Sequence, residues 1–349
     1  MKRLVLPLVS VALVLALAAC QGEAPGPPPI EWPQIKSYDP MVIPADNPMT
    51  PAKVELGKQL YYDQRLSGDA SRACYSCHLA EKGLTDGLPK AIGAYGVPLP
   101  RSAPTMWNIG YHKEFYWDGR SPTLEAQAKA AWAGGNMGAS GKDGRPSVDD
   151  VCTKLSQIEG YRKQFQEVFG AGCTPDNGAK ALAAFMRTIV ANHTNSPWVR
   201  FREGNQNALS EQARRGWQVF GETAKCTNCH DGVLLTDLQF HTAGIGWDAK
   251  KKEFADVGRF KVTNDEKHKG AFKTPTLLDI AESAPYFHDG SVATLEEAVD
   301  LMLAGGVKNP VGDANLEPRK LTAEQRADLL AFLRALTADY RVQAPELPQ

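Results

Sequence analysis

The sequence contains two copies of a Cys-x-x-Cys-His motif, at residues 74–78 and 226–230. Two cysteines at this spacing can form thioether bonds with the two vinyl groups of one haem, and the histidine that follows then binds the iron. A disulfide loop, a redox dithiol and half of a zinc site are the alternatives, but none of them explains a histidine after both pairs. We therefore predict two covalently bound haem c groups, attached through Cys74, Cys77, Cys226 and Cys229, with His78 and His230 as iron ligands.

The first twenty residues resemble the signal peptide of a bacterial lipoprotein. Two basic residues precede an apolar run over residues 4–19, and the run ends at Cys20, which would carry the lipid after cleavage. The alternative is an ordinary signal peptide that happens to end beside a cysteine. Both predict export, and Gln21 after the cysteine suggests a periplasmic protein anchored by lipid to the outer membrane. Residues 21–40 are rich in Pro and Gly and are expected to act as a tether.

Two cysteines, Cys152 and Cys173, belong neither to the signal peptide nor to the haem motifs. In an oxidising compartment they are expected to form a disulfide, and two unpaired buried thiols are the alternative. The formal net charge is −1, with charged residues at 23%, so nothing indicates a nucleic-acid partner.

The elements that position the haem motifs are predicted to be mainly α-helices. Capping residues and apolar residues at helical spacing predict helices over residues 51–63, 180–192, 210–220, 294–304 and 322–337. Long Gly/Pro-rich loops are expected over residues 82–104 and 134–146. The predicted fold is mostly α, with two cytochrome c-like haem domains and long loops. The domains are expected to span residues 41–198 and 199–349, with a boundary near residues 196–204.

An approximate repeat supports two related domains. A helix with an internal glycine, Gly57 or Gly216, precedes each haem motif, and an aromatic residue follows the glycine within the same helix. This pattern predicts a helix that packs tightly near each haem. Two unrelated amphipathic helices are the alternative.

Five further segments carry a resemblance to a known family. They read Asp-Gly-Leu-Pro at 86–89, Pro-Arg-Ser-Ala-Pro-Thr at 100–105, Tyr-Trp-Asp-Gly-Arg at 116–120, Gly-Arg-Phe-Lys-Val-Thr at 258–263 and Ala-Pro-Tyr-Phe-His-Asp-Gly-Ser at 284–291. With both haem motifs, they make the chain resemble the bacterial dihaem cytochrome c peroxidases and their relative that matures the tryptophan tryptophylquinone cofactor. The resemblance implies that the N-terminal haem reacts with peroxide and that the C-terminal haem accepts electrons.

For the C-terminal haem, the resemblance implies a methionine as the second axial ligand. Met302, 14 residues after His288, matches that position, at which the maturase relatives carry a tyrosine. A thioether ligand favours ferrous iron and raises the reduction potential, which suits a haem that receives electrons. A core methionine without an iron contact is the alternative.

For the N-terminal haem, the sequence departs from the family pattern. Many members have a histidine 16 residues after the proximal one, whereas this chain has Ala94 there. We expect an open or water-bound sixth position, with Tyr95 as an alternative ligand. Gln127 matches the glutamine expected over the peroxide site, but Asn136 stands where a glutamate is expected. An amide can hydrogen-bond peroxide without accepting its proton, so slower O–O cleavage is expected, and Glu125 should face elsewhere.

The resemblance also implies roles for six other residues. Trp117 matches a tryptophan that lies between the haems and relays electrons, and a plain core residue is the alternative. Arg120 and Arg259 are candidates to pair with haem propionates, or are solvated structural arginines. A calcium ion between the domains is expected at three positions, Ser102, Ser283 and Pro285, of which the first replaces a usual Asn.

The leading functional prediction is therefore an exported dihaem c-type peroxidase. It would reduce hydrogen peroxide to water with electrons from a small cytochrome c or cupredoxin. One alternative is a protein-modifying dihaem oxidase that acts on aromatic residues of a partner protein, and another is a dihaem electron carrier. Family members are often dimeric, so a homodimer is one expectation, and membrane contact is expected only through the lipid anchor.

Overall fold

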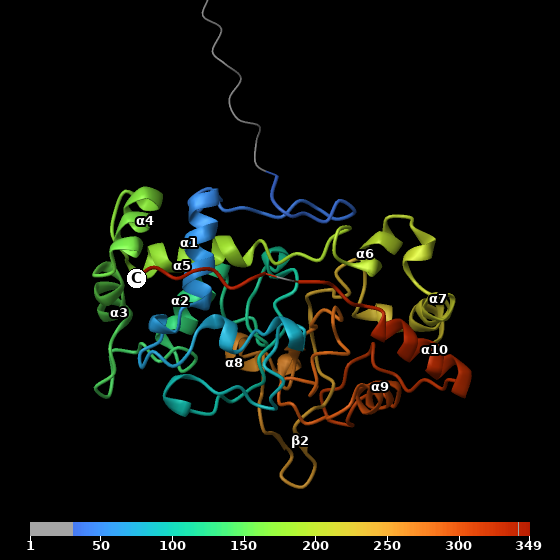
Figure 1. Ribbon diagram of the computed structural model, residues 1–349. Coiled ribbons are helices and arrows are strands. Elements are labelled where there is room, and N and C mark those ends of the chain that lie inside the picture. Colours follow the sequence, from blue (N-terminus) through green and yellow to red (C-terminus); the bar gives the residue numbers. More distant parts are fainter. Residues whose placement is uncertain (1–30, 341) are drawn as a thin grey trace, which may run out of the picture. The chain divides into compact units, whose positions relative to one another are not determined.

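The computed structural model describes residues 31–340 and 342–349, of which Pro33–Gln349 form one compact unit (Figure 1). The predicted signal peptide and Cys20 lie outside the described residues, as does the first part of the predicted tether. The secondary structure is mostly helical, which confirms the predicted class. In the described part of the chain, we find no helix with the length and apolar character needed to cross a membrane.

The first half contains two helices that pack closely against each other, α1 (Pro51–Tyr62) and α5 (Pro175–Met186). The Thr50 hydroxyl caps α1 by accepting a hydrogen bond from the amide of Lys53. Gly57 of α1 faces the backbone of α5 so closely that a Cβ atom would overlap with the Ala181 carbonyl. Only glycine permits this approach, as the sequence pattern predicted.

The second half repeats this arrangement with α7 (Glu211–Gln218) and α10 (Ala323–Arg334). A Cβ atom at Gly216 of α7 would overlap with the Asp328 carbonyl of α10. A π-helical turn (Val219–Thr223) then leads from α7 to the second haem motif. Each haem motif is therefore preceded by a helix whose glycine allows tight contact with a later helix, as the predicted repeat required.

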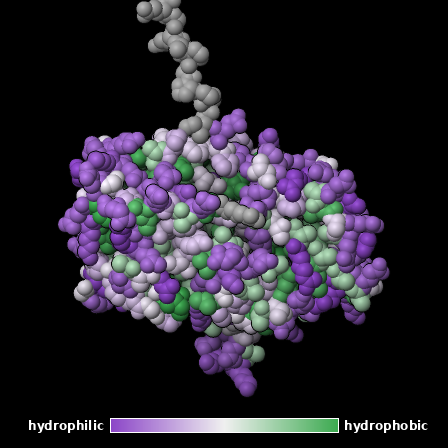
Figure 2. All heavy atoms as spheres, in the orientation of Figure 1, coloured by the Kyte–Doolittle hydropathy of each residue, from purple (hydrophilic) through white to green (hydrophobic). Residues whose placement is uncertain are grey.

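The other helices are distributed along both halves of the chain, and the strands are short. The remaining helices are α2 (Leu124–Ala133), α3 (Val148–Ser156), α4 (Glu159–Phe169), α6 (Pro197–Arg202), α8 (Phe260–Thr263) and α9 (Leu295–Leu303). Two antiparallel pairs join β1 (Phe240–His241) to β4 (Phe272–Lys273) and β2 (Trp247–Asp248) to β3 (Glu253–Phe254). The hairpin of β2 and β3 carries mainly hydrophilic side chains (Figures 1 and 2).

The predicted helix boundaries agree well except in one case. The helix expected at residues 180–192 is α5, which begins at Pro175 and ends at Met186. Thr174 caps it by accepting a hydrogen bond from the amide of Asn177, and a proline in the first turn favours the earlier start. Sequence patterns missed the helices α3 and α4. The short helix α6 occupies the segment of the expected domain boundary, which stays a prediction.

The disulfide between Cys152 and Cys173 is present, with the two Cα atoms 5.2 Å apart. It ties α3 to the segment between α4 and α5. The expected pairing is therefore confirmed.

Candidate haem sites

The two haem motifs adopt the same local structure. Each begins with a 3-10 turn, Cys74–Ser76 or Cys226–Asn228. In both, the amide of the second cysteine donates to the carbonyl of the first, at 3.1 Å for Cys77 and 3.2 Å for Cys229. The turn therefore closes in the same way in both motifs, directly before the histidine.

Both motif histidines are oriented by a backbone carbonyl. Nδ1 of His78 lies 3.0 Å from the carbonyl oxygen of Leu84, and Nδ1 of His230 lies 3.0 Å from that of Leu235. Burial lowers the pKa of both imidazoles, which keeps them neutral. A neutral imidazole whose Nδ1–H is held by a carbonyl presents the Nε2 lone pair, as an axial iron ligand requires.

The four motif cysteines are unbonded, whereas Cys152 and Cys173 pair. Burial raises the pKa of Cys74 and Cys226 to about 12 and that of Cys77 to about 11. A redox dithiol needs a thiol with a lowered pKa, so these residues do not suit that alternative. Partly buried, unbonded cysteine pairs followed by an oriented histidine fit covalent haem attachment.

A large, mainly apolar cavity adjoins the second motif. Met302, on α9, lies in its wall together with Cys226, Cys229 and His230. Other apolar side chains complete the wall, among them Phe220, Ile245, Phe272, Leu295, Val299, Leu329 and Leu333. The cavity has the lining that a flat hydrophobic ring with one proximal histidine and one thioether would need.

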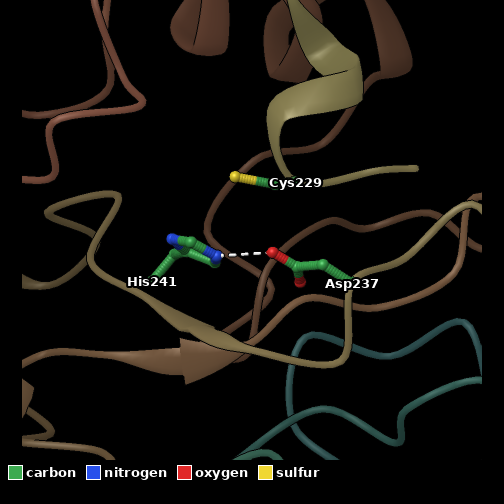
Figure 3. Close-up of side chains that lie close together, drawn as sticks. All are labelled: Cys229, Asp237 and His241. Atoms are coloured by element: carbon green, nitrogen blue, oxygen red, sulfur yellow. Dashed lines mark hydrogen bonds and ion pairs between the residues drawn. The ribbon is translucent and has the colours of Figure 1, made fainter.

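A cluster of Cys229, Asp237 and His241 stands beside this cavity (Figure 3). Nε2 of His241 lies 2.8 Å from the Asp237 carboxylate, and Nδ1 lies 2.7 Å from that of Asp313. Chiefly because of the bond to Asp313, the pKa of His241 rises to about 11. Both ring nitrogens of His241 therefore face carboxylates at the edge of the haem cavity, an arrangement that favours the protonated imidazole.

The two departures from the family pattern meet near the first motif. The amide of Ala94 donates to the Asn136 carbonyl at 3.0 Å, and the Cys77 sulfur lies 4.0 Å from the Ile92 carbonyl oxygen. Tyr95 has other partners, because its amide donates to Asp69 and its ring lies under the Arg145 guanidinium at 4.4 Å. Its exposed ring does not support the alternative of a tyrosine ligand.

Gln127 lies on α2 and is half-buried. Its backbone carbonyl accepts a hydrogen bond from the Tyr116 hydroxyl at 3.3 Å, and within the described part of the chain its side-chain amide has no hydrogen-bond partner. Glu125, on the same helix, faces elsewhere as expected. It forms an ion pair with Arg187 at 2.7 Å and accepts a hydrogen bond from Asn47 at 2.7 Å. The Glu125 carboxylate is therefore already bound by Arg187 and Asn47, and it cannot replace the glutamate that is expected at position 136.

Trp117 connects residues of the two halves. Its indole Nε1 donates to the Ser102 carbonyl at 3.0 Å, and its own carbonyl accepts the amide of Lys273 at 2.8 Å. Its side chain also lies in the wall of the second cavity. A large aromatic ring therefore stands between the segment at residues 100–105 and the second haem cavity.

Arg120 and Arg259, the two candidates to pair with haem propionates, differ in whether a buried N–H group of the guanidinium still lacks a partner in the described part of the chain. Arg120 pairs with Asp118 at 2.9 Å and stacks on Tyr116. Arg259 pairs with Glu114 at 2.7 Å, yet among the described residues its buried Nε atom has no hydrogen-bond partner. A buried unpaired donor calls for an acceptor, and a haem propionate would supply one. Arg259 therefore fits the predicted role better than Arg120.

The predicted calcium residues do not form a ready oxygen cage around Ser102. Its carbonyl accepts the Trp117 indole, and its hydroxyl donates to the Phe287 carbonyl at 2.9 Å. The Ser283 hydroxyl donates to the Ile280 carbonyl at 3.3 Å, and Pro285 follows a cis peptide bond. A cation at Ser102 would have to share oxygen atoms that already accept or donate.

Sequence reasoning missed several charged residues around the sites. Arg101 pairs with Asp118 at 2.8 Å and with Asp256 at 2.6 Å, and so joins segments 155 residues apart. Asp237 and Asp313 hold His241, although their positions in the sequence give no sign of this contact.

Comparison with known proteins places the chain in a family. The family model for di-haem cytochrome c peroxidase matches residues 51–207. The chain is 35% identical to cytochrome-c peroxidase IdrP1 of Denitromonas iodatirespirans, over 94% of this chain and 93% of that protein. It is 37% identical to methylamine utilization protein MauG of Methylorubrum extorquens, over 87% of this chain and 84% of that protein. The chain belongs to the di-haem cytochrome c peroxidase family, whose name implies two haem cofactors.

A solved structure is also similar over most of its length. It is a MauG-like protein associated with microbial copper homeostasis, with a TM-score of 0.78 and 31% sequence identity. The alignment covers 89% of this chain and 96% of that one. The comparisons thus confirm the predicted family and the class of enzyme, an oxidoreductase of the cytochrome-c peroxidase type.

Proposed function

We propose that this protein reduces hydrogen peroxide to water with electrons from a small cytochrome c or cupredoxin. The supporting observation is an asymmetry between two otherwise similar motifs. Each motif histidine has its own backbone carbonyl partner at 3.0 Å, but Met302 lines the cavity of one motif, while Ala94 and Asn136 pair near the other. Haem c bound at the two motifs would supply the redox-active iron atoms.

In this proposal, each half of the chain is a cytochrome c-like domain with its own task. The helix pairs α1–α5 and α7–α10, each with one glycine contact, support this division. The thioether of Met302 would raise the potential at the second site, so that electrons enter there. Trp117 lies between the halves, where an aromatic ring assists electron transfer from one site to the other.

At the first site, the chain would bind and orient peroxide through amide groups. The Gln127 side chain has no competing hydrogen bond from residues 31–340 and 342–349, and the Asn136 side chain can donate or accept one. Neither can hold the peroxide proton near neutral pH, so a water molecule would have to move it between the oxygen atoms. Slow peroxide cleavage is therefore part of the proposal.

The cellular location of the protein and the binding of a calcium ion are separate proposals. We propose that residues 1–20 direct export, that lipidated Cys20 anchors the protein to the outer membrane from the periplasmic side, and that the haems are bound covalently. Labelling with a radioactive fatty acid in the wild type and in Cys20→Ser would test the anchor. Calcium at Ser102, Ser283 and Pro285, and a homodimer, are tested by measuring bound calcium and solution mass before and after chelation.

The decisive experiment is oxidation of a reduced c-type cytochrome by hydrogen peroxide, using fully ferric enzyme that was not reduced beforehand. Turnover from the first cycle is expected, because Ala94 leaves the iron without a protein ligand on that side. A lag that pre-reduction abolishes would mean that another residue caps the iron. No turnover in either state would contradict the peroxidase proposal.

A second candidate is a protein-modifying oxidase that acts on aromatic residues of a partner protein. The 37% identity to a MauG protein favours it, and Met302 in place of the maturase tyrosine opposes it. Peroxide-dependent oxidation of a partner protein in the absence of an electron donor would support this candidate. Two six-coordinate low-spin ferric haems would instead favour a plain electron carrier.

A further inference from the structure

Three tyrosine rings form a row beside the first haem motif. Tyr61 and Tyr62 are the last residues of α1, and Tyr75 lies inside the motif, in the 3-10 turn Cys74–Ser76. The ring centroids of Tyr61 and Tyr62 are 5.4 Å apart, and those of Tyr62 and Tyr75 are 4.6 Å apart. The row is therefore continuous, with no gap between neighbouring aromatic side chains.

The inner end of the row lies against the proximal ligand. Tyr61 is 1% exposed, and its hydroxyl oxygen lies 3.5 Å both from the backbone carbonyl oxygen of His78 and from the sulfur of Met106. Tyr61 is thus placed to exchange an electron with the His78 site.

Of the three tyrosines, only Tyr75, at the outer end of the row, has a base beside its hydroxyl group in the described part of the chain. The Tyr75 hydroxyl faces a carboxylate oxygen of Glu81 at 3.4 Å, in an exposed position. Tyr61 and Tyr62 donate instead to the backbone carbonyls of His78 and Val342. A carbonyl cannot take a phenolic proton at neutral pH, whereas a carboxylate can. A tyrosine that loses an electron also loses its proton, so Tyr75 is the stable end point of the row.

A neighbouring phenol does not compete for this role. Tyr340 lies 5.5 Å from the ring of Trp107, but among the described residues its buried hydroxyl has no hydrogen-bond partner. An oxidised Tyr340 would have nowhere to release its proton. The geometry therefore distinguishes Tyr75, whose hydroxyl faces a carboxylate, from neighbouring tyrosines that have no such partner among the described residues.

We propose that the row Tyr61–Tyr62–Tyr75 carries oxidising equivalents from the His78 haem site to the surface, where Tyr75 oxidises small phenols. This second activity rests on the proposed function, since peroxide is the oxidant. Tyr75 sends one electron inward through Tyr62 and Tyr61 and passes its proton to Glu81. A phenol then returns a hydrogen atom to Tyr75, and the proton on Glu81 is consumed as water forms. The balance is one peroxide and two phenols to two waters and two phenoxyl radicals.

The test uses the ferric holoprotein with one equivalent of hydrogen peroxide and a nitroso spin trap. Trapped tyrosyl radicals are located by mass spectrometry of the digested protein, and the haem absorption spectrum is recorded in parallel. Tyr75→Phe and Tyr62→Phe keep the aromatic packing but remove the phenol. Tyr38→Phe is the matched control, because Tyr38 is 40% exposed and also packs edge-on against a tyrosine, Tyr111.

We expect adducts at Tyr75 in the wild type, their loss in Tyr62→Phe, and no change in Tyr38→Phe. Oxidation of guaiacol should fall in both relay variants, while peroxide-driven oxidation of reduced cytochrome c should not. Adducts spread evenly over exposed tyrosines, or a haem spectrum that changes without any adduct, would overturn the relay alone. A haem spectrum that does not respond to peroxide would overturn the proposed function, and the relay with it.

Discussion

The backbone amide of Ala94 donates a hydrogen bond to the carbonyl oxygen of Asn136, at 3.0 Å. These residues replace the histidine and the glutamate that the family resemblance leads one to expect, and they lie 42 positions apart in the sequence. The segments that carry Ala94 and Asn136 also pack closely. A Cβ atom added at Gly138, two residues after Asn136, would lie 2.9 Å from the side chain of Ala94. The two substitutions therefore belong to one structural unit beside the first haem motif, and they can be reversed separately.

Replacing Asn136 by glutamate should accelerate the reaction with peroxide. A carboxylate can accept the proton that an amide cannot, and general base catalysis of this kind contributes about 10²–10⁴-fold. Stopped-flow measurement of the second-order rate between ferric protein and peroxide should show a gain on the order of 10²-fold in Asn136→Glu. Asn136→Gln, which lengthens the side chain without adding a base, is the control. Equal rates in the two variants would rule out a missing base as the cause.

Replacing Ala94 by histidine should cap the first iron. Ala94 is buried, so the new imidazole has little access to water and would bind the iron instead. The ferric protein should change from a high-spin to a low-spin signal in electron paramagnetic resonance, and turnover should acquire a lag that pre-reduction removes. Ala94→Val adds bulk but no ligand. If the valine variant showed the same low-spin signal, histidine ligation would not be the explanation.

Replacing Met302 by leucine should lower the reduction potential of the second haem, because it removes the thioether that favours ferrous iron. A spectroelectrochemical titration of both haems would measure the change, with the first haem as an internal reference. Met186→Leu is the matched control, since Met186 is a buried methionine of α5 in the other half of the chain. An unchanged potential in Met302→Leu would make Met302 an ordinary core residue.

Asp279 should make the protein less stable as the pH rises from about 4 to about 6. Its carboxylate accepts hydrogen bonds from the Trp107 indole at 2.7 Å and from the Ala338 amide at 2.9 Å, yet burial raises its pKa to about 6. The folded state thus holds a proton that the unfolded state releases near pH 4. Stability from this group is present below pH 4 and is lost as the pH passes 6, on the order of 3 kcal/mol in total.

Asp279→Asn is the variant that tests this dependence. Asn tolerates the positive φ of 52° at this position. However, Asn has only one side-chain oxygen, so its NH2 group must face either the Trp107 indole or the Ala338 amide, which are both donors. Urea unfolding between pH 4.5 and 7.5 should show that stability falls with pH more steeply in the wild type than in the variant. The variant should also be less stable at pH 4.5, by about 1–3 kcal/mol. Parallel pH profiles would contradict the assignment.

Much of the local structure was predictable from short segments. Thr50, Thr294 and Thr322 mark the starts of α1, α9 and α10, and each accepts a hydrogen bond from an amide three residues later. The haem motifs, and the single disulfide among the described cysteines, also follow from residue type and spacing. The start of α5 was placed too late, because the capping residue Thr174 lies before the strongest apolar pattern.

The sequence by itself therefore determined the cofactor class, the family and most long helices, because thioether spacing, helix capping and helical periodicity act over a few residues. Only the tertiary structure decided which distant residues meet: Gly57 against Ala181, His241 between Asp237 and Asp313, and Ala94 against Asn136. These contacts join segments that are far apart in the chain. They arise when whole helices and loops pack around the haem sites, and no short-range pattern records which surfaces will come together.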